Sequence, residues 1–297
     1  MLYTKKVRWR WVFSSSLLRN ELWQGLPGGV LRVAEKACCG LFQLVFPDDC
    51  RVCGEPLREI SRIPVCSRCL KEPEPFVAEY FCVACRTPFL NRAPLDESGR
   101  CAMCRLGLSG YDAVYSYGSY EGALRKLVHL FKYGGVRPLA KPLGDYLARA
   151  LPRDQRFDLI VPMPLHWRRR WQRGFNQADL LAREIARRWS APVGRIARRV
   201  RFTAPQAGLT LAQRRQNVRG AFSVMRGVRL DGMRVLLVDD VLTTGASASA
   251  CARALKRAGA SHVALLTLAR ADRRAALSYL QDFSTVATAT AAGSVSA

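Results

Sequence analysis

The chain contains 297 residues, and 47 basic against 23 acidic residues give it a formal net charge of +24. Hydrophobic residues make up 49% of it. This excludes a wholly disordered polycation, because disordered chains are poor in the apolar residues that offset the entropy lost on ordering. Charges interrupt the apolar runs before the roughly 20 residues that a membrane-spanning helix needs. We therefore expect a folded protein without a membrane span, built from one large domain and a small module.

Residues 1–29 combine tryptophans, serines and basic residues without a clear period, and we expect a poorly ordered extension here. No uninterrupted apolar stretch of the roughly 7–15 residues found in secretory signals follows the first basic residues. We therefore expect a reducing, cytoplasmic compartment. Residues 30–46 have the apolar spacing of an amphipathic helix that packs onto the segment after it.

Cysteine spacing is the strongest signal in the next segment. Eight of the eleven cysteines form four Cys-x-x-Cys pairs: Cys50/Cys53, Cys66/Cys69, Cys82/Cys85 and Cys101/Cys104. Two such pairs can surround one metal tetrahedrally, so four pairs predict two sites of four cysteines each. Because thiolates fill every position and leave none for a catalytic water, we predict two structural zinc ions, with iron as the alternative metal. A disulfide scaffold would need an oxidising compartment, and a redox motif would be expected only once.

From residue 111 onward, segments of strand and helix character alternate, which predicts an α/β fold with a parallel sheet. The predicted strands are 113–117, 157–161, 233–238 and 262–268, and the predicted helices are 123–131, 139–151, 175–189 and 246–258. We expect residues 30–108 to form the helix and cysteine module, 109–272 the α/β domain, and 273–297 a partly disordered tail.

The segment after the third predicted strand carries the chemistry. An apolar run ends in Asp239 and Asp240, and a short loop with Thr243, Thr244 and Gly245 then leads into a helix. Ligands of parallel sheets bind at the carboxyl ends of strands, and helix N-termini attract phosphate. Glycine lets the backbone approach the ligand closely. The two carboxylates would repel a phosphate, which favours sugar hydroxyls or a hydrated metal ion as their partners.

Residues 235–247 resemble the phosphoribosyl pyrophosphate (PRPP) signature of type I phosphoribosyltransferases. The resemblance implies that Asp239 and Asp240 hold the ribose hydroxyls and that Mg²⁺ accompanies PRPP. It also implies that the 5′-phosphate lies within a loop formed by Thr243, Thr244, Gly245, Ala246 and Ser247. The segment formed by Pro162, Met163 and Pro164 is similar in position to the family's pyrophosphate loop.

The order of the motifs is similar to that of the ComF family of competence proteins, across about residues 30–270. After the cysteine pairs and the proline-rich loop come Arg173-Gly174-Phe175-Asn176-Gln177-Ala178, Gln206, Arg214-Arg215-Gln216-Asn217-Val218 and Gly220-Ala221-Phe222. That family joins a double zinc ribbon to a phosphoribosyltransferase-like domain. The resemblance implies a role in DNA uptake during natural transformation and a competence helicase as a partner.

Half of the net charge lies between His166 and Arg219, where 14 arginines face two acidic residues. One hypothesis is that Arg173, Arg214 and Arg215 bind diphosphate, whose charge grows as it leaves, in a PRPP or nucleotide site. The alternative is a non-catalytic protein that binds single-stranded DNA through arginines and interleaved aromatic residues, or an adaptor of the competence machinery. We expect His166 to be exposed.

Overall fold

A computed structural model describes residues 49–57, 61–89, 91–92, 94–107, 109–201 and 220–271. The expected N-terminal extension, the helix predicted at residues 30–46 and the expected tail lie outside these ranges. Within them, two cysteine-containing modules precede an α/β domain.

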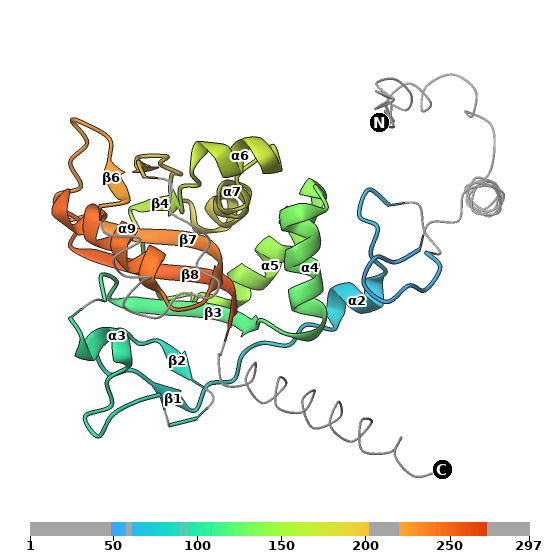
Figure 1. The fold of residues 1–297 in the computed structure, drawn as a ribbon, viewed down its shortest axis with the longest axis horizontal. Helices are drawn as coiled ribbons and strands as arrows, with labels where there is room; N and C mark the ends of the chain where they lie inside the picture. Colours follow the sequence, from blue (N-terminus) through green and yellow to red (C-terminus); the bar gives the residue numbers. More distant parts are fainter. Residues whose placement is uncertain are drawn as a thin grey trace, which may run out of the picture.

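The domain is built on a sheet of four parallel strands in the order β3-β8-β7-β4 (Figure 1). In chain order the elements are α2 (Ser67–Lys71), β1 (Tyr80–Phe81), β2 (Pro88–Phe89), α3 (Ala102–Arg105), β3 (Ala113–Ser119), α4 (Gly122–Tyr133), η1 (Arg137–Leu139), α5 (Ala140–Ala150), β4 (Leu159–Pro162), α6 (Trp167–Arg173), α7 (Gln177–Trp189), β5 (Ala197–Arg199), β6 (Phe222–Val224), β7 (Arg234–Leu242), α9 (Ala246–Arg257) and β8 (His262–Arg270). The predicted parallel α/β fold is confirmed.

The central strand β7 is longer than its apolar run predicts. Its pairing with β4 ends at Pro162 and Val238, but its pairing with β8 continues as far as Leu242 and Arg270. The two aspartates therefore belong to the strand rather than to the loop. Main-chain pairing with β8 holds this extension, while its other edge lies beyond the end of β4.

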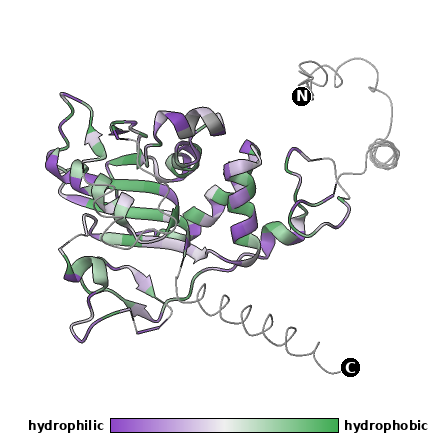
Figure 2. Cartoon of the chain, viewed as in Figure 1, coloured by the Kyte–Doolittle hydropathy of each residue, from purple (hydrophilic) through white to green (hydrophobic). Residues whose placement is uncertain are grey.

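Two apolar cores lie on opposite faces of the sheet. Leu236 and Val238 of β7 pack with α4, α5 and α7, whereas Val235 and Leu237 pack with α9. This alternation follows from the two-residue period of a strand, and burial on both faces explains the continuous apolar run in the sequence. Figure 2 shows the hydrophobic strands between more polar helices.

The two cysteine modules lie on different parts of the domain (Figure 1). In the first module, the Val52 carbonyl accepts a 3.0 Å hydrogen bond from Lys126 of α4. In the second module, Phe89 of β2 lies under the Arg270 guanidinium at the end of β8, 4.0 Å from the ring centroid. The two modules thus pack on opposite sides of the sheet.

Three features differ from the sequence-based expectation or go beyond it. Helix α6 has the sequence WRRRWQR, which offers no apolar stripe to predict it. Strands β5 and β6 form an antiparallel pair of three residues each, too short for a visible pattern. The expectation of an exposed His166 is wrong: this residue is 6% exposed, and its ring lies beside Trp167 with the centroids 5.6 Å apart.

None of the helices in the described ranges has both the length and the apolar character needed to cross a bilayer.

Candidate functional site

The candidate site lies at the carboxyl ends of β4 and β7. The chain leaves β4 toward α7, on the face that carries α4 and α5, but it leaves β7 toward α9 on the opposite face. Where neighbouring parallel strands diverge in this way, an open sheet has its usual ligand crevice. The two loops singled out in the sequence, residues 162–164 and 243–247, border this divergence.

The loop after β7 fits a phosphate group. Gly245 is the N-cap of α9 and supplies no side-chain cap, so the amide N–H groups of the first turn can donate hydrogen bonds to an anion. The Thr244 hydroxyl oxygen is buried and has no hydrogen-bond partner among the described residues. A buried hydroxyl without a partner costs about 1–3 kcal/mol, which a bound phosphate oxygen would offset.

Glycine is required at position 245 for two reasons. Its φ of 76° lies in the left-handed region that side chains with a Cβ disfavour. A Cβ there would also lie 2.5 Å from the Tyr111 hydroxyl oxygen. The loop therefore approaches Tyr111 too closely for any other residue.

The two aspartates are held by positive charge from both faces of the sheet. Asp240 Oδ1 lies 2.7 Å from Lys132 Nζ of α4, and these side chains are only 13% and 14% exposed. Burial, reinforced by the neighbouring Asp240, raises the pKa of Asp239 to about 7, although Lys132 and Arg199 of β5 oppose the shift. The Asp239 carboxylate also accepts a 2.9 Å hydrogen bond from the Asp240 amide.

Lys132 reaches Asp240 because of the pattern of α4. Leu124, Leu127, Val128 and Phe131 are buried at helical spacing, which turns this face of the helix toward the sheet and brings the last turn to the strand ends. Burial alone would lower the pKa of Lys132, but Asp240 and Asp239 outweigh it and raise that pKa. Lys132 therefore stays charged beside the two carboxylates.

Arg173 joins the same neighbourhood through Gln177. Its guanidinium donates to Gln177 Oε1 at 3.2 Å and to the Tyr133 hydroxyl at 3.2 Å. Gln177 is 1% exposed and donates in turn to the Lys132 carbonyl at 3.4 Å. Arg173, which we predict to bind diphosphate, is thus connected to the main chain of Lys132 through the side chain of Gln177.

The proline-rich loop is fixed by main-chain contacts. The Met163 amide donates to the Val238 carbonyl at 2.8 Å, and the Met163 carbonyl accepts from the Asn176 side chain at 3.0 Å. Asn176 also caps α7 by accepting from the Ala178 amide at 3.1 Å. Beside this loop lies a cleft of about 460 Å³, whose lining includes Trp167 and Arg199.

The structure brings together most of the predicted site residues, namely Asp239, Asp240, Arg173 and those of the two loops. Arg214 and Arg215 lie outside the described residues. Sequence reasoning missed Lys132 and Arg199. Lys132 carried one usable signal, since only eight of the 47 basic residues are lysines. Arg199 carried none, because it is one of the 14 arginines between His166 and Arg219.

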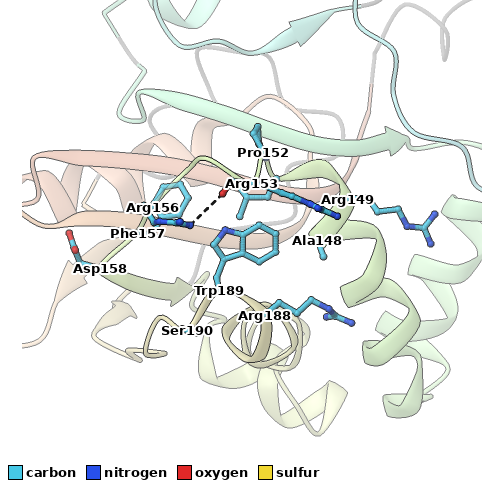
Figure 3. A pocket seen from close by; sticks show the side chains of 11 residues that line it. Ala148, Arg149, Pro152, Arg153, Arg156, Phe157, Asp158, Arg188, Trp189 and Ser190 are labelled. Atoms are coloured by element: carbon cyan, nitrogen blue, oxygen red, sulfur yellow. Dashed lines mark hydrogen bonds between the residues drawn. The ribbon is translucent and has the colours of Figure 1, made fainter.

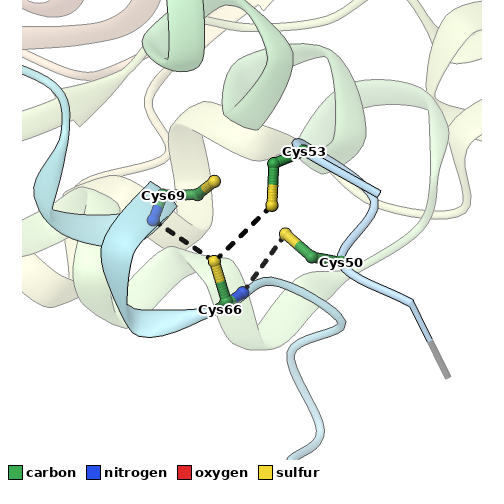
Figure 4. A group of neighbouring side chains, drawn as sticks. All are labelled: Cys50, Cys53, Cys66 and Cys69. Atoms are coloured by element: carbon green, nitrogen blue, oxygen red, sulfur yellow. Dashed lines mark hydrogen bonds between the residues drawn. The ribbon is translucent and has the colours of Figure 1, made fainter. Parts of the chain in front are cut away.

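The predicted cysteine groups form two clusters whose ligand atoms lie within 4.8 Å of one another. The Sγ atoms of Cys53 and Cys66 are 3.8 Å apart (Figure 4), and those of Cys85 and Cys101 are 3.7 Å apart. A zinc ion bound tetrahedrally at about 2.3 Å from each sulfur separates the sulfurs by about 3.8 Å. Both clusters could therefore bind zinc.

The same main-chain hydrogen bond recurs in both clusters. The Cys66 amide donates to Cys50 Sγ at 3.3 Å, and the Cys101 amide donates to Cys82 Sγ at 3.3 Å. The two clusters thus share this hydrogen bond as well as the Cys-x-x-Cys spacing within each pair, although twelve residues separate the pairs in the first and fifteen in the second.

A larger cleft of about 1090 Å³ lies at the opposite end of the sheet, near the start of β4 (Figure 3). Its lining includes four arginines around Trp189. Arg149 and Arg188 belong to the last turns of α5 and α7, where basic side chains complement the negative end of the helix dipole. Arg188 also donates to the Glu184 carbonyl at 3.1 Å and pairs with Asp145. Helix ends account for these two arginines, and the cleft is separate from the candidate site.

The sequence is similar to those of known proteins. The phosphoribosyl transferase domain family matches residues 178–289. Competence protein F of Haemophilus influenzae is 33% identical over 222 residues, which cover 71% of this chain and 93% of that protein. DNA utilization protein YhgH of Salmonella typhimurium is 32% identical over 235 residues, covering 76% and 99%. Competence protein ComFC of Bacillus subtilis is 27% identical over 236 residues, covering 76% and 87%.

The parallel sheet and the loops at its strand ends define a type I phosphoribosyltransferase fold, preceded by two cysteine clusters consistent with zinc ribbons. The chain belongs to the family of competence protein F and the DNA utilization protein YhgH. The family resemblance drawn from the motifs is confirmed.

The ion pair between Lys132 and Asp240 should be measurable in stability. We expect Lys132→Met to lower the free energy of unfolding by roughly 3 kcal/mol, because Asp240 loses its partner in a poorly hydrated site. Lys132→Met/Asp240→Asn should recover part of this loss. A double-mutant cycle of denaturant unfolding should give a coupling energy of roughly 1–3 kcal/mol. Lys141→Met, on the exposed surface of α5, is the control and should add independently to Asp240→Asn; additivity in both cycles would contradict the ion pair.

Asp239 should make stability depend on pH. An unfolded aspartate ionises near pH 4, whereas this one keeps its proton up to about pH 7 when folded. The folded state therefore binds more protons between these values, and wild-type stability falls as pH rises through them. Asparagine cannot ionise, so Asp239→Asn should raise the Tm by about 5 °C at pH 8 and by less at pH 5. Asp154→Asn, at an exposed position, should show no such trend, and a Tm difference independent of pH for Asp239→Asn would refute the shift.

Proposed function

We propose that this protein binds PRPP or a related nucleotide together with Mg²⁺ in the crevice between β4 and β7. The observation that carries the proposal is the loop after β7, where an uncapped helix N-terminus and a buried, unpartnered threonine hydroxyl meet beside two carboxylates. The 5′-phosphate would bind at residues 243–247. The ribose hydroxyls would bind at Asp239 and Asp240, and the diphosphate at residues 162–164 with Arg173, Arg214 and Arg215.

In the proposed site, Lys132 competes with the ribose hydroxyls for Asp240. Its ammonium group pairs with one oxygen of the Asp240 carboxylate. A ribose hydroxyl that donates to Asp240 would release Lys132 toward the negatively charged diphosphate. Binding would thus exchange one partner of Lys132 for another, without leaving a charge unpaired in a poorly hydrated site.

In a transfer reaction, the bond between ribose C1 and the diphosphate oxygen breaks with both electrons going to diphosphate. A nitrogen of a base or nucleotide forms the new bond to C1 and loses its proton. Mg²⁺ supplies charge neutralisation of the diphosphate when it is bound. The guanidinium groups and Lys132 would stabilise the charge that grows on the leaving oxygen.

We further propose that the two cysteine clusters hold structural zinc, with each ion supplying much of the folding free energy of its small module. Both clusters need reduced thiolates, which favours the cytoplasm as the compartment. The relatives named as competence and DNA utilization proteins support a role in DNA uptake. The competence helicase remains a proposed partner that only the family resemblance implies. The domains would then be residues 30–108 and 109–272.

Calorimetric titration with PRPP and Mg²⁺ tests the proposed ligand. We expect wild-type protein to bind, and Asp240→Asn and Thr244→Val each to weaken binding by roughly tenfold, about 1.4 kcal/mol. Thr244→Val removes a buried hydroxyl without a partner, so it should not lower the Tm. Asp154→Asn should bind as wild type does. Absence of binding by wild-type protein would rule the proposal out, and pyrophosphate release with candidate bases then separates an enzyme from a binding protein.

A second function, binding of single-stranded DNA, is favoured by α6. Trp167 and Trp171 lie four residues apart on this helix and are 64% and 85% exposed. Side chains at this spacing share one helix face, and exposed rings can stack on bases. Arg168 lies over the Trp167 ring at 5.3 Å from the centroid, and the adjacent cleft is lined by Arg198 and Arg199. We propose that this surface binds the strand, so that the protein serves the competence machinery with or without catalysis.

Fluorescence anisotropy with labelled single-stranded DNA tests this surface. We expect Trp167→Ala/Trp171→Ala to weaken binding by roughly tenfold or more, since each stacked base contributes about 1–3 kcal/mol. Both rings are exposed, so the Tm should change little. Phe81→Ala removes another exposed ring, in β1, and should leave binding unchanged. Equal affinity of the tryptophan variant and the wild type, or affinity that does not fall steeply with salt, would exclude this surface.

A further inference from the structure

The two cysteine clusters pack against different parts of the candidate site. Cys50 and Cys69 of the first cluster belong to the core that contains α4 and α5. Cys82, Cys85 and Cys101 of the second cluster belong to the opposite core, together with Leu242 and Ala246. Leu242 and Ala246 flank the loop proposed to bind the 5′-phosphate. The second cluster and this loop are therefore parts of one packed unit.

Tyr111 connects the second cluster to the loop. It lies between α3 and β3, is 5% exposed, and approaches Gly245 so closely that only glycine fits there. Tyr111 also belongs to the same buried core as Cys82, Cys85 and Cys101. It therefore packs with the second cluster and contacts the loop at Gly245.

A second contact brings the two backbones together one residue earlier. A Cβ at Gly110 would lie 2.3 Å from the Ser249 carbonyl oxygen and 3.0 Å from the Arg253 amide nitrogen. The segment that leaves the second cluster is therefore pressed against the first turns of α9. Because the neighbouring atoms are backbone, α9 has no room to move closer to residue 110.

The second module also contacts the end of β8, next to the end of β7. Thr87 is 5% exposed, and its hydroxyl lies 2.9 Å from Cys85 Sγ. Phe89, two residues later, contacts Arg270, which pairs with Leu242 at the end of β7. The first cluster instead contacts the domain through α4, where Lys126 donates to Val52, and through α5, where Tyr146 donates to Leu70.

We infer that the second cluster positions the 5′-phosphate loop through Gly110 and Tyr111, so that metal bound at Cys82, Cys85, Cys101 and Cys104 and phosphate bound at residues 243–247 strengthen each other's binding. Tyr111 is a positioning residue in this arrangement, because it contacts the loop and not the ligand. The identity of the phosphate ligand rests on the proposed function, but the coupling between cluster and loop does not. The first cluster does not share this coupling.

Because of thermodynamic linkage, the inference can be tested by measuring metal binding. If metal strengthens phosphate binding, then PRPP must strengthen metal binding at the same cluster by the same factor. With two zinc ions per chain, a chromophoric chelator should remove both in the absence of PRPP. With PRPP and Mg²⁺ present, we expect equilibrium competition with the chelator to show roughly 5–50-fold tighter binding of one of the two ions, and unchanged binding of the other.

Matched variants identify which ion is protected. Cys66 and Cys101 occupy equivalent positions, each before a short helix and each donating its amide to the first sulfur of its cluster. Cys66→Ser should remove the ion whose binding does not depend on PRPP. Cys101→Ser should remove the protected one and weaken PRPP binding by roughly tenfold. Equal protection of both ions, or of neither, would overturn the inference.

Tyr111→Phe keeps the test valid if a cysteine variant fails to fold. This variant retains both clusters and the ring but loses the hydroxyl against Gly245. We expect its zinc content to stay at two per chain while the protection by PRPP is reduced at least about threefold. Unchanged protection would show that Tyr111 has no positioning role.

Hydrogen exchange tests the coupling even without a phosphate ligand. Loss of metal from the second cluster, in Cys101→Ser, should speed exchange of the amides of residues 242–250 by roughly tenfold or more, whereas Cys66→Ser should not. If calorimetry finds no PRPP binding but this difference is present, the proposed function fails and the positioning by the second cluster stands. If PRPP binds and the two variants exchange alike, the reverse holds.

Discussion

A parallel sheet that is covered on both faces can gather polar groups only where its strands end. Strand β7 is buried from Val235 to Val238 and is paired on both sides there, so it has no room for a charged side chain before Asp239. Its extension past the end of β4 brings two carboxylates to the crevice while β8 still holds their backbone. Every other part of the candidate site is placed by its relation to this strand end.

Two carboxylates on adjacent residues would repel each other in a poorly hydrated crevice, and basic side chains from both faces of the sheet reduce this repulsion. Lys132 arrives from α4 and pairs with Asp240, while Arg199 of β5 favours the ionised form of Asp239. The remaining burial still raises the pKa of Asp239, so the site is strained electrostatically before any ligand binds. Such a site gains from sugar hydroxyls and cations, which relieve the repulsion. Only a few of the many arginines of the chain therefore lie near these carboxylates. Others pair locally, as Arg195 does with Asp179.

The duplicated cysteine modules show how one small unit can take two roles through packing alone. Their cysteines are arranged alike, but one packs on the face that supplies Lys132 and the other on the face that carries residues 243–247. Modules this small bury little apolar surface of their own, so each gains stability from its neighbour in the domain. Differences in function between the two arise from the surfaces they touch.

Local patterns in the amino-acid sequence were sufficient to predict the fold class and the two four-cysteine clusters, because these follow from residue spacing and from the period of buried segments. The family was implied by the resemblance of the motifs and their order. The same local logic failed for α6 and the β5–β6 pair, whose apolar patterns are too weak or too short, and for His166, which is buried although the two residues that follow it in the sequence are exposed. Lys132 and Tyr111 could not be placed from the sequence, since their partners Asp240 and Gly245 belong to elements far along the chain. Only the packing of α4 and of the second cysteine module against the sheet brings these groups within hydrogen-bonding or van der Waals distance, and no local pattern encodes a contact between distant elements.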